Sequence, residues 1–534
     1  MTPPENSEQQ PDIVDTPPEA RQFSPLVREE GPEHPSPEWF AREATNYGRT
    51  LEGPLEQVTN PQFVARLTQQ SLANVATYSA RSASDPSWLL GGITGLLEGI
   101  LGGLSDPESL SGLVEEQLLG TLQGIPEDPT SALALLGNAP VLPLCATWGA
   151  QCAGDPFRYP GVDRFYSEVG EITPVVFYDR DCARLTGRVW RPSGLPEGTT
   201  LPNVVIQNGS VQAPETLYWW MAQLLVENGY AVMTFDPRGQ GRADLQTPQG
   251  VQGSNFNPVV FWEGFVDAID FFRSTPDQPY PHNDTCAGTT PTPVTAFNPY
   301  FAQLDPDRLG IAGHSLGAVG ASIVQGMGGV GADPWDGVID VDNPVKVALG
   351  WDGAIAPSGP QLDDDENGPR SASSPIGLLF SLVGADAPRP QFVPRVPMMM
   401  QDSDYGITPV PFFEPPNPRG QLQPFDAWKA AGADSFSFTI RGSSHFEWSL
   451  LPTFPTTSWC PEIMDGRCQG GWGLPMAEHY SLAWLDRYLK LAGEPGFEDA
   501  DDRLLDDETW RERFSFYYDA DREFVTRDGT RVTN

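Results

Sequence analysis

Basic residues are scarce in this sequence. Its 534 residues include 32 lysines and arginines against 71 aspartates and glutamates, which gives a formal net charge of −39. A surface of that sign repels phosphate backbones and anionic head groups, so neither nucleic acid nor an acidic membrane is expected as a partner. Charged residues make up only 19% of the chain, which excludes a highly charged disordered protein.

Long apolar runs are also missing. The most apolar stretch, residues 88–104, carries Glu98 and repeated glycines, and it is shorter than the roughly 20 residues of a membrane-spanning helix. We interpret it as a helical hairpin packed on the main domain, so no stable membrane insertion is expected. The first 20 residues contain neither a basic start nor an apolar run, so they predict no signal peptide.

Cysteine is rare, and its spacing favours disulfides over a zinc site, which needs tighter groups of cysteine and histidine. Cys145 with Cys152 and Cys460 with Cys468 form two local pairs, which leaves Cys182 and Cys286 as a possible long-range pair. The connectivity stays open, since six cysteines allow several pairings. Disulfides imply an oxidising compartment, so we expect an extracellular protein.

The chain divides into four regions by composition. Residues 1–50 are proline-rich and acidic and predict a disordered arm, whereas 51–155 show helical spacing and predict a helical extension. Residues 156–493 predict the catalytic domain, and 494–534 an acidic tail whose aromatic segment adds an edge strand. An insertion at 354–395 is either a lid or an inert surface excursion. Its acidic run, 363–366, is interpreted as a solvated turn in preference to a calcium site.

The region 156–493 alternates β-branched runs with amphipathic helices, which predicts an α/β fold with a mostly parallel eight-stranded sheet. The expected strands are 175–179, 185–192, 203–208, 231–236, 308–313, 345–351, 396–402 and 435–442. The expected helices are 214–229, 258–274, 316–327 and 477–493.

Residues 313–317, Gly-His-Ser-Leu-Gly, match the G-x-S-x-G nucleophile elbow. Such a serine sits on a strained turn between a strand and a helix, where side chains two residues to either side would collide. The buried run before the motif and the Gly/Ala-rich run after it provide that setting. Ser315 is therefore the candidate nucleophile.

A serine hydroxyl needs a base, and the sequence offers five histidines. His445 follows the last expected core strand and is the candidate base. His314, inside the motif, is expected to point away from the serine. His34, His282 and His479 are assigned to the arm, a loop and the amphipathic face of the last helix.

The imidazole needs a carboxylate partner. The expected position follows the penultimate strand, where Asp404 is our first choice and Asp402 the second. Asp352, after the preceding strand, is the third candidate. Two backbone amides should stabilise an oxyanion, and we assign Leu316 and, in the loop after strand 203–208, Ser210. This chemistry requires neither a metal nor an organic cofactor.

These motifs, with residues 235–244 and 442–446, resemble the α/β-hydrolase superfamily over roughly 160–490. Residues 215–236, the Gly350–Trp351 pair and Asp404 before Ile-Thr-Pro resemble bacterial cutinases and polyester hydrolases. That resemblance implies that Trp351 lines an acyl site; Phe446, beside the candidate base, is a second expected substrate contact. The chain departs from the subgroup at Leu316, at the Asn-Gly-Ser loop and at Asp352.

The sequence thus predicts a serine carboxylic-ester hydrolase with a small-molecule or polymeric ester as substrate, and it sets no oligomeric state. Within that class it leaves open a cutinase-like polyester hydrolase or lipase. An acyltransferase or peptidase would use the same acyl-enzyme. A non-catalytic binding module on a hydrolase scaffold is the remaining alternative.

Overall fold

The computed structural model describes residues 31–59, 165–209, 215–357, 389–449, 458–459 and 469–533, except for short gaps at 242, 245, 252, 254–256, 290–292, 408–409 and 471. The expected hairpin at 88–104, the core of the insertion at 354–395 and four of the six cysteines lie outside these residues.

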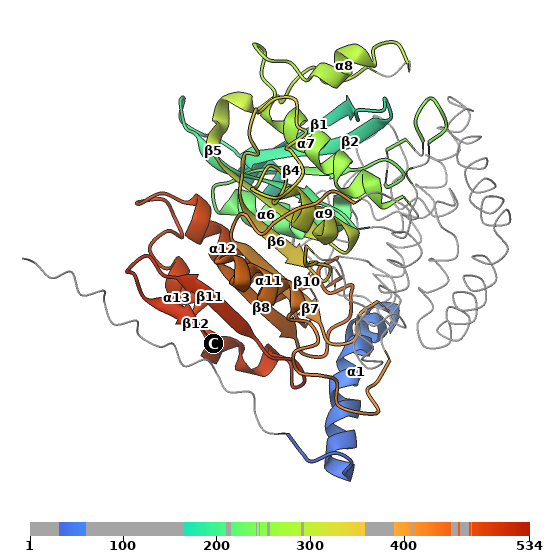
Figure 1. The fold of residues 1–534 in the computed structure, drawn as a ribbon, viewed down its shortest axis with the longest axis vertical. Coiled ribbons are helices and arrows are strands. Elements are labelled where there is room, and N and C mark those ends of the chain that lie inside the picture. The colour runs from blue at the N-terminus through green and yellow to red at the C-terminus, as the bar shows by residue number, and fades with distance from the viewer. Residues whose placement is uncertain are drawn as a thin grey trace, which may run out of the picture.

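A ten-stranded mixed sheet forms the centre of the molecule, in the order β1-β2-β4-β3-β5-β6-β7-β8-β11-β12 (Figure 1). Its strands are β1 Gly170–Tyr178, β2 Arg184–Pro192, β3 Leu201–Gln207, β4 Ala231–Asp236, β5 Leu304–His314, β6 Val345–Trp351, β7 Met398–Ser403, β8 Ser435–Ile440, β11 Asp521–Val525 and β12 Arg531–Thr533. A separate two-stranded ribbon pairs β9 Ser458–Trp459 with β10 Gln469–Gly470.

The eight expected strands correspond to β1–β8, but the expected sheet was too small and too uniformly parallel. Strands β3 to β8 pair in parallel, whereas β1 and β2 at one edge and β11 and β12 at the other pair antiparallel. The aromatic segment of the acidic tail does supply a strand, β11, but this strand lies between β8 and β12, so the edge of the sheet is β12. The described part of the tail, 494–533, is therefore joined to the folded domain, because β11 pairs directly with β8.

Helices cover both faces of this sheet because successive strand residues point to opposite sides. On one face α7, α9 and α11 pack on side chains such as Val205 and Ile311; on the other, α6 and α12 pack on neighbours such as Val204 and Ala312. The helices are α6 Trp219–Glu227, α7 Glu263–Arg273, α8 Pro281–Thr285, α9 Leu316–Val324, α11 Gln423–Ala431, α12 Leu474–Leu489, α13 Ala500–Leu504 and α14 Asp507–Trp510.

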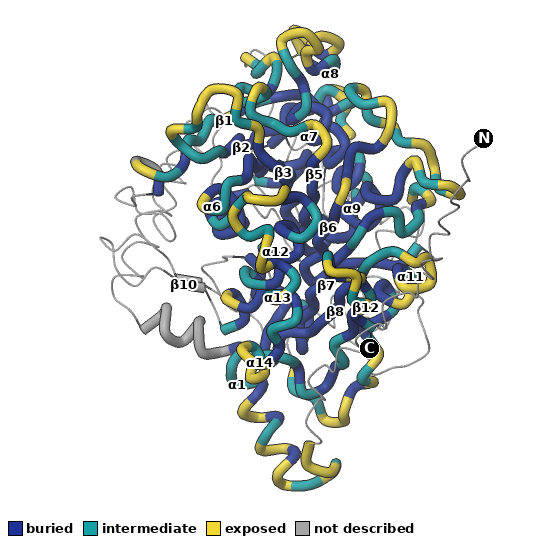
Figure 2. Tube along the Cα trace, turned by 90° about the vertical axis from the view of Figure 1, so that its left-hand side faces the viewer, coloured by how far each residue is buried: buried dark blue, intermediate teal, exposed yellow. Residues whose placement is uncertain are grey.

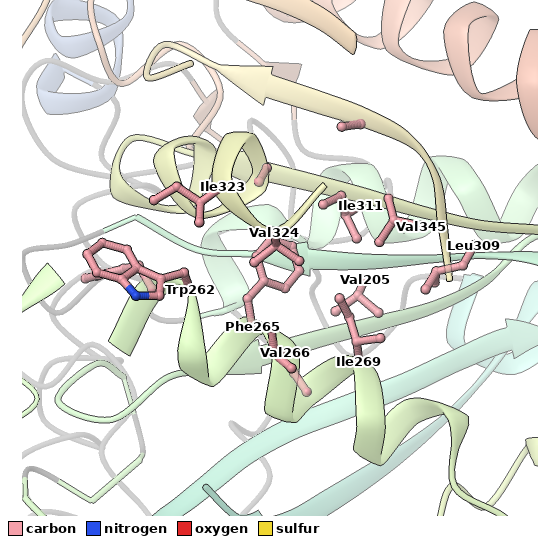
Figure 3. Packing of buried hydrophobic residues seen from close by; sticks show 14 of the residues in the cluster. Val205, Trp262, Phe265, Val266, Ile269, Leu309, Ile311, Ile323, Val324 and Val345 are labelled. Carbon is pink, nitrogen blue, oxygen red and sulfur yellow. The ribbon is translucent and has the colours of Figure 1, made fainter. Parts of the chain in front are cut away.

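The core between the sheet and α7 and α9 consists of interlocking aliphatic and aromatic side chains. Figure 3 shows these side chains, which come from β3, β5 and β6 and from both helices: Val205, Leu309, Ile311, Val345, Phe265, Val266, Ile269, Ile323 and Val324. Figure 2 shows that the strands are buried along the middle of the molecule while exposure is concentrated in the loops at its periphery. The strand ends that carry the predicted site are thus fixed by packing.

The N-terminal arm contains a helix that the sequence analysis did not predict. Helix α1 spans Pro37–Thr59, so residues 37–50 are not an irregular arm. Ser36 caps it, since its Oγ accepts the backbone N–H of Trp39 at 3.1 Å, and Pro37 occupies its first turn. Trp39 is buried in a small aromatic cluster with Tyr517 and Tyr518. This packing on the C-terminal segment stabilises a helix that composition alone disfavours.

The expected long-range disulfide is present. Cys182, in the turn between β1 and β2, is bonded to Cys286, which follows α8. It joins segments 104 residues apart in the sequence. Among the described residues, no helix is long and apolar enough to cross a bilayer.

Replacement of Ile311 by alanine tests the packing of β5. The side chain is fully buried between β5 and α9, so we expect the free energy of unfolding to fall by about 2–5 kcal/mol in urea denaturation. Val330→Ala, at a fully exposed position, is the control and should change it by less than about 0.5 kcal/mol. Equal effects of the two substitutions would contradict this core.

Candidate active site

Ser315 occupies the turn between β5 and α9, as the motif predicts. Its backbone has φ 58° and ψ −125°, a conformation that is strained for a residue with a side chain. Its N–H donates to the carbonyl of Trp351 at 3.0 Å, which ties the turn to the end of β6. Only 8% of the residue is exposed. The turn therefore has the geometry of a nucleophile elbow.

Three glycines make this turn possible. A Cβ on Gly313 would lie 2.1 Å from the carbonyl oxygen of Gly317, and one on Gly317 would lie 2.5 Å from that of Asn208. A Cβ on Gly353 would lie 2.3 Å from the carbonyl oxygen of Ser315 itself. The motif predicted the first two glycines; the third lies in the loop after β6.

His445 is hydrogen-bonded to Asp352. Its Nδ1 lies 2.6 Å from Asp352 Oδ2, and both side chains are buried. Because a carboxylate only accepts, Nδ1 carries the proton of the neutral ring and Nε2 is left as the basic nitrogen. This pair has the geometry that a base and its orienting carboxylate require.

The carboxylate of Asp352 is held in place by Ser403 at the end of β7. The backbone N–H of Ser403 donates to Oδ1 at 2.9 Å and its hydroxyl donates to Oδ2 at 2.8 Å. The Ser403 hydroxyl in turn accepts the N–H of Gly406 at 3.0 Å. Asp352 itself has φ 45°, which turns its side chain out of the strand direction. These contacts fix the carboxylate before any substrate binds.

The choice of Asp404 as the acid is corrected by this geometry. Its carboxylate accepts hydrogen bonds from Asn46 of α1 at 3.0 Å, from Ser515 at 2.5 Å and from the N–H of Gly442 at 2.7 Å. It therefore fastens α1 and the C-terminal segment to the loop after β8. Asp402, the second choice, is buried within β7. Asp352, ranked third, is the residue that reaches His445, because the loop after β6 turns toward it.

Of the two expected oxyanion donors, Leu316 lies among the described residues and Ser210 does not. Leu316 begins α9, where the first N–H groups of a helix have no partner within the helix, so its amide fits the expected role. Gly209, which precedes Ser210, lies against the elbow: a Cβ there would be 3.0 Å from Ser315 Cβ. The loop after β3 thus does approach the nucleophile.

The two expected substrate contacts lie in different places. Trp351 is fully buried on the α6 and α12 face, where its indole N–H donates to Ser481 at 3.1 Å and its ring packs on Trp220. Trp351 is therefore a core residue, and its expected place in an acyl site is wrong. Phe446 is half-buried, with its ring centroid 5.6 Å from that of His445. Its role as a substrate contact stays a prediction.

His314 does not point away from the site, contrary to expectation. Its ring centroid lies 4.5 Å from that of His445, and its Nε2 bonds the carbonyl of His445 at 2.7 Å. Its Nδ1 lies 2.8 Å from the hydroxyl of Tyr218, at the end of the short helix Glu215–Tyr218. Burial, with His445 nearby, lowers the pKa of His314 from 6.5 to about 3. Two histidines, not one, thus stand beside the elbow.

The buried Asp404 predicts a pH dependence of stability. Burial raises its pKa from 3.8 to about 6 despite its three hydrogen bonds. The native state then holds a proton that the unfolded state releases, so this group lowers the free energy of unfolding as the pH rises from about 3.8 to about 6. We expect the wild type to lose stability relative to Asp404→Asn over that range in urea denaturation. A difference independent of pH would contradict this.

No family model matches the sequence, and the similarity of the chain to the known proteins named here is limited. Thiohydrolase aneE from Aspergillus aculeatus is 29% identical over 114 residues, which are 21% of this chain and 31% of that protein. An acylaminoacyl peptidase from Pyrococcus horikoshii has a TM-score of 0.38 and 15% identity, with 65% of this chain and 46% of the peptidase covered. The chain therefore spans under half of either relative.

Proposed function

We propose that this protein is a serine hydrolase that cleaves carboxylic esters through an acyl-enzyme on Ser315. The hydrogen bond of 2.6 Å between His445 and Asp352, beside the elbow that carries Ser315, is the observation on which the proposal rests. Nucleophile, base and orienting carboxylate come from three strand ends of one sheet. The resemblance of the sequence to α/β-hydrolases agrees with this assignment.

In the first half-reaction Ser315 Oγ attacks the ester carbonyl carbon, and His445 Nε2 takes the hydroxyl proton. Asp352 holds the ring in the required tautomer and stabilises the imidazolium. The negative oxygen of the tetrahedral intermediate is placed at the start of α9, where the Leu316 amide donates to it. The C–O bond then breaks, and His445 returns the proton to the departing alcohol.

In the second half-reaction water attacks the acyl carbon of Ser315 while His445 accepts its proton. The tetrahedral intermediate collapses, the carboxylic acid leaves, and Ser315 recovers its proton. A thioester would form the same acyl-enzyme with a thiol as leaving group. Because one of the similar proteins is named a thiohydrolase, thioesters belong among the substrates to be tested.

An extracellular location is part of the same proposal. It is supported by the Cys182–Cys286 disulfide, since disulfides persist mainly in oxidising compartments. The strongly acidic composition agrees with a soluble ester or a polymer surface as substrate in preference to an anionic membrane.

Two substitutions test the assignment. We expect Ser315→Ala to lower kcat for p-nitrophenyl esters by about 10⁴-fold or more, since nothing replaces the nucleophile. Asp352→Asn should cost about 10⁴-fold because the wrong tautomer of His445 is then favoured. Rates should be compared across acetate to palmitate esters, the matching thioesters and an anilide, so that the preferred leaving group and acyl length emerge.

Asp404→Asn is the matched control. Asp404 is also buried and lies one strand further along the sheet. Its carboxylate accepts a hydrogen bond from Asn46 of α1, whereas that of Asp352 is bonded to His445. We expect the kcat of Asp404→Asn to stay within about tenfold of wild type. Larger loss in Asp404→Asn than in Asp352→Asn would overturn the assignment of the acid. Equal rates for wild type and Ser315→Ala on every substrate would overturn the proposed function.

A further inference from the structure

Tyr218 and His314 lie between the two parts of the site that must be held together. Both are buried, with exposed fractions of 1% and 3%. The Tyr218 hydroxyl contacts His314 Nδ1 at 2.8 Å and the backbone nitrogen of Gly209 at 3.1 Å. On its other side His314 reaches the carbonyl of His445 at 2.7 Å. A continuous path of hydrogen bonds thus runs from the loop after β3 to the loop after β8.

The direction of every hydrogen bond in this path follows from the partners at its ends. The carbonyl of His445 only accepts, so His314 Nε2 carries a proton and donates. The buried ring is neutral at pH 7, because its pKa lies near 3, so Nδ1 has no proton and accepts. Tyr218 therefore donates its hydroxyl proton to His314 Nδ1, and its oxygen accepts the N–H of Gly209.

This path reaches both groups that must be positioned for an acyl transfer. Gly209 packs against the elbow so closely that a Cβ there would lie 3.0 Å from Ser315 Cβ and 3.2 Å from the Tyr218 oxygen. The Gly209 amide is bonded to Tyr218, which orients the peptide that leads into the loop expected to supply the second oxyanion donor. At the other end, His314 holds the His445 backbone while its ring lies against the His445 ring, with 4.5 Å between the centroids and a tilt of 33°.

His445 is consequently fixed at three atoms. Its ring Nδ1 bonds Asp352, its backbone N–H donates to the carbonyl of Gly406 at 2.8 Å, and its carbonyl accepts from His314. Asp352 alone would leave the ring free to pivot about the Nδ1 hydrogen bond. The contact with His314 removes that freedom, and small errors in the position of a base cost large factors in rate.

We propose that Tyr218 and His314 form a hydrogen-bonded bridge that positions Gly209 and His445 relative to Ser315. This inference rests on the proposed function. Both are positioning residues, since they act through Gly209 and His445. The bridge acts on the transition state more than on substrate binding, because the groups that it aligns interact most strongly with the tetrahedral intermediate.

Tyr218→Phe tests the bridge with the least change in shape, because it removes only the hydroxyl. We expect kcat to fall by about 10- to 100-fold with KM nearly unchanged. His314→Phe keeps an aromatic ring but loses both hydrogen bonds, and its kcat should fall by at least as much. The double variant should lose far less than the product of the two single effects, because both substitutions break the same path.

Tyr230→Phe is the matched control. Tyr230 is also fully buried, and its hydroxyl donates to Asp486 at 2.7 Å in a contact that involves neither the elbow nor His445. It should lose stability with kcat nearly unchanged. If Tyr218→Phe lost no more kcat than Tyr230→Phe, or changed only KM, the bridge would be overturned while the proposed hydrolase function stood.

The tautomer of His314 gives a readout independent of activity. Imidazole ¹⁵N NMR, assigned with the His314→Phe variant, should find the proton of His314 on Nε2 and not on Nδ1 at neutral pH. A proton on Nδ1 would overturn the bridge whatever the rates. If wild type and Ser315→Ala hydrolysed every ester equally, the proposed function would fail, and the role assigned to the bridge would fail with it.

Discussion

The parallel pairing of β5 with β6 is the constraint on which the site depends. It sets His314 opposite Trp351, so the residues that follow, Ser315 and Asp352, leave the sheet side by side. The N–H of Ser315 donates back to Trp351, which fastens one strand end to the other. A slip of β6 against β5 by one residue would turn the side chains of β6 to the opposite face of the sheet. The core on both faces, which fixes the register, is therefore also what aligns the chemistry.

The polar groups of the site are buried and already hydrogen-bonded. Asp352 accepts two bonds from Ser403 and one from His445, so its charge is stabilised by fixed dipoles in place of water. His314 is neutral and uses both ring nitrogens. Burying such groups costs free energy, which the surrounding hydrophobic clusters offset. As a consequence, the site needs little rearrangement when charge develops in a transition state.

Sequence patterns predicted most of the scaffold. The β-branched runs located β1–β8, and the elbow motif located Ser315 together with the glycines that its turn requires. The turn is determined by steric contacts between residues close in sequence, so a motif of five residues is enough to predict it. His445 was identified as the only suitable histidine after a late core strand. Helix α1 escaped prediction because its buried side chains meet partners more than 350 residues away, such as Tyr405.

The carboxylate that contacts His445 was ranked third, for a different reason. Asp352 and Asp404 each follow a parallel strand, and sequence position alone favoured the later one. What separates them is the path of each loop in space: Asp352 turns out of β6 at positive φ toward His445, whereas Asp404 meets Asn46 and Ser515. Those partners come from distant parts of the chain. No local sequence pattern indicates that Asn46 and Ser515 bond Asp404 while Asp352 bonds His445.

The rate at which a fluorophosphonate modifies the protein tests most directly whether Ser315 is activated by His445 and Asp352. The modified residue should be identified by peptide mass spectrometry in wild type, Asp352→Asn and Asp404→Asn. Rapid labelling of Ser315 is expected in wild type and in Asp404→Asn, and labelling slower by orders of magnitude in Asp352→Asn. Labelling of another residue, or a rate that Asp352→Asn leaves unchanged, would contradict the account.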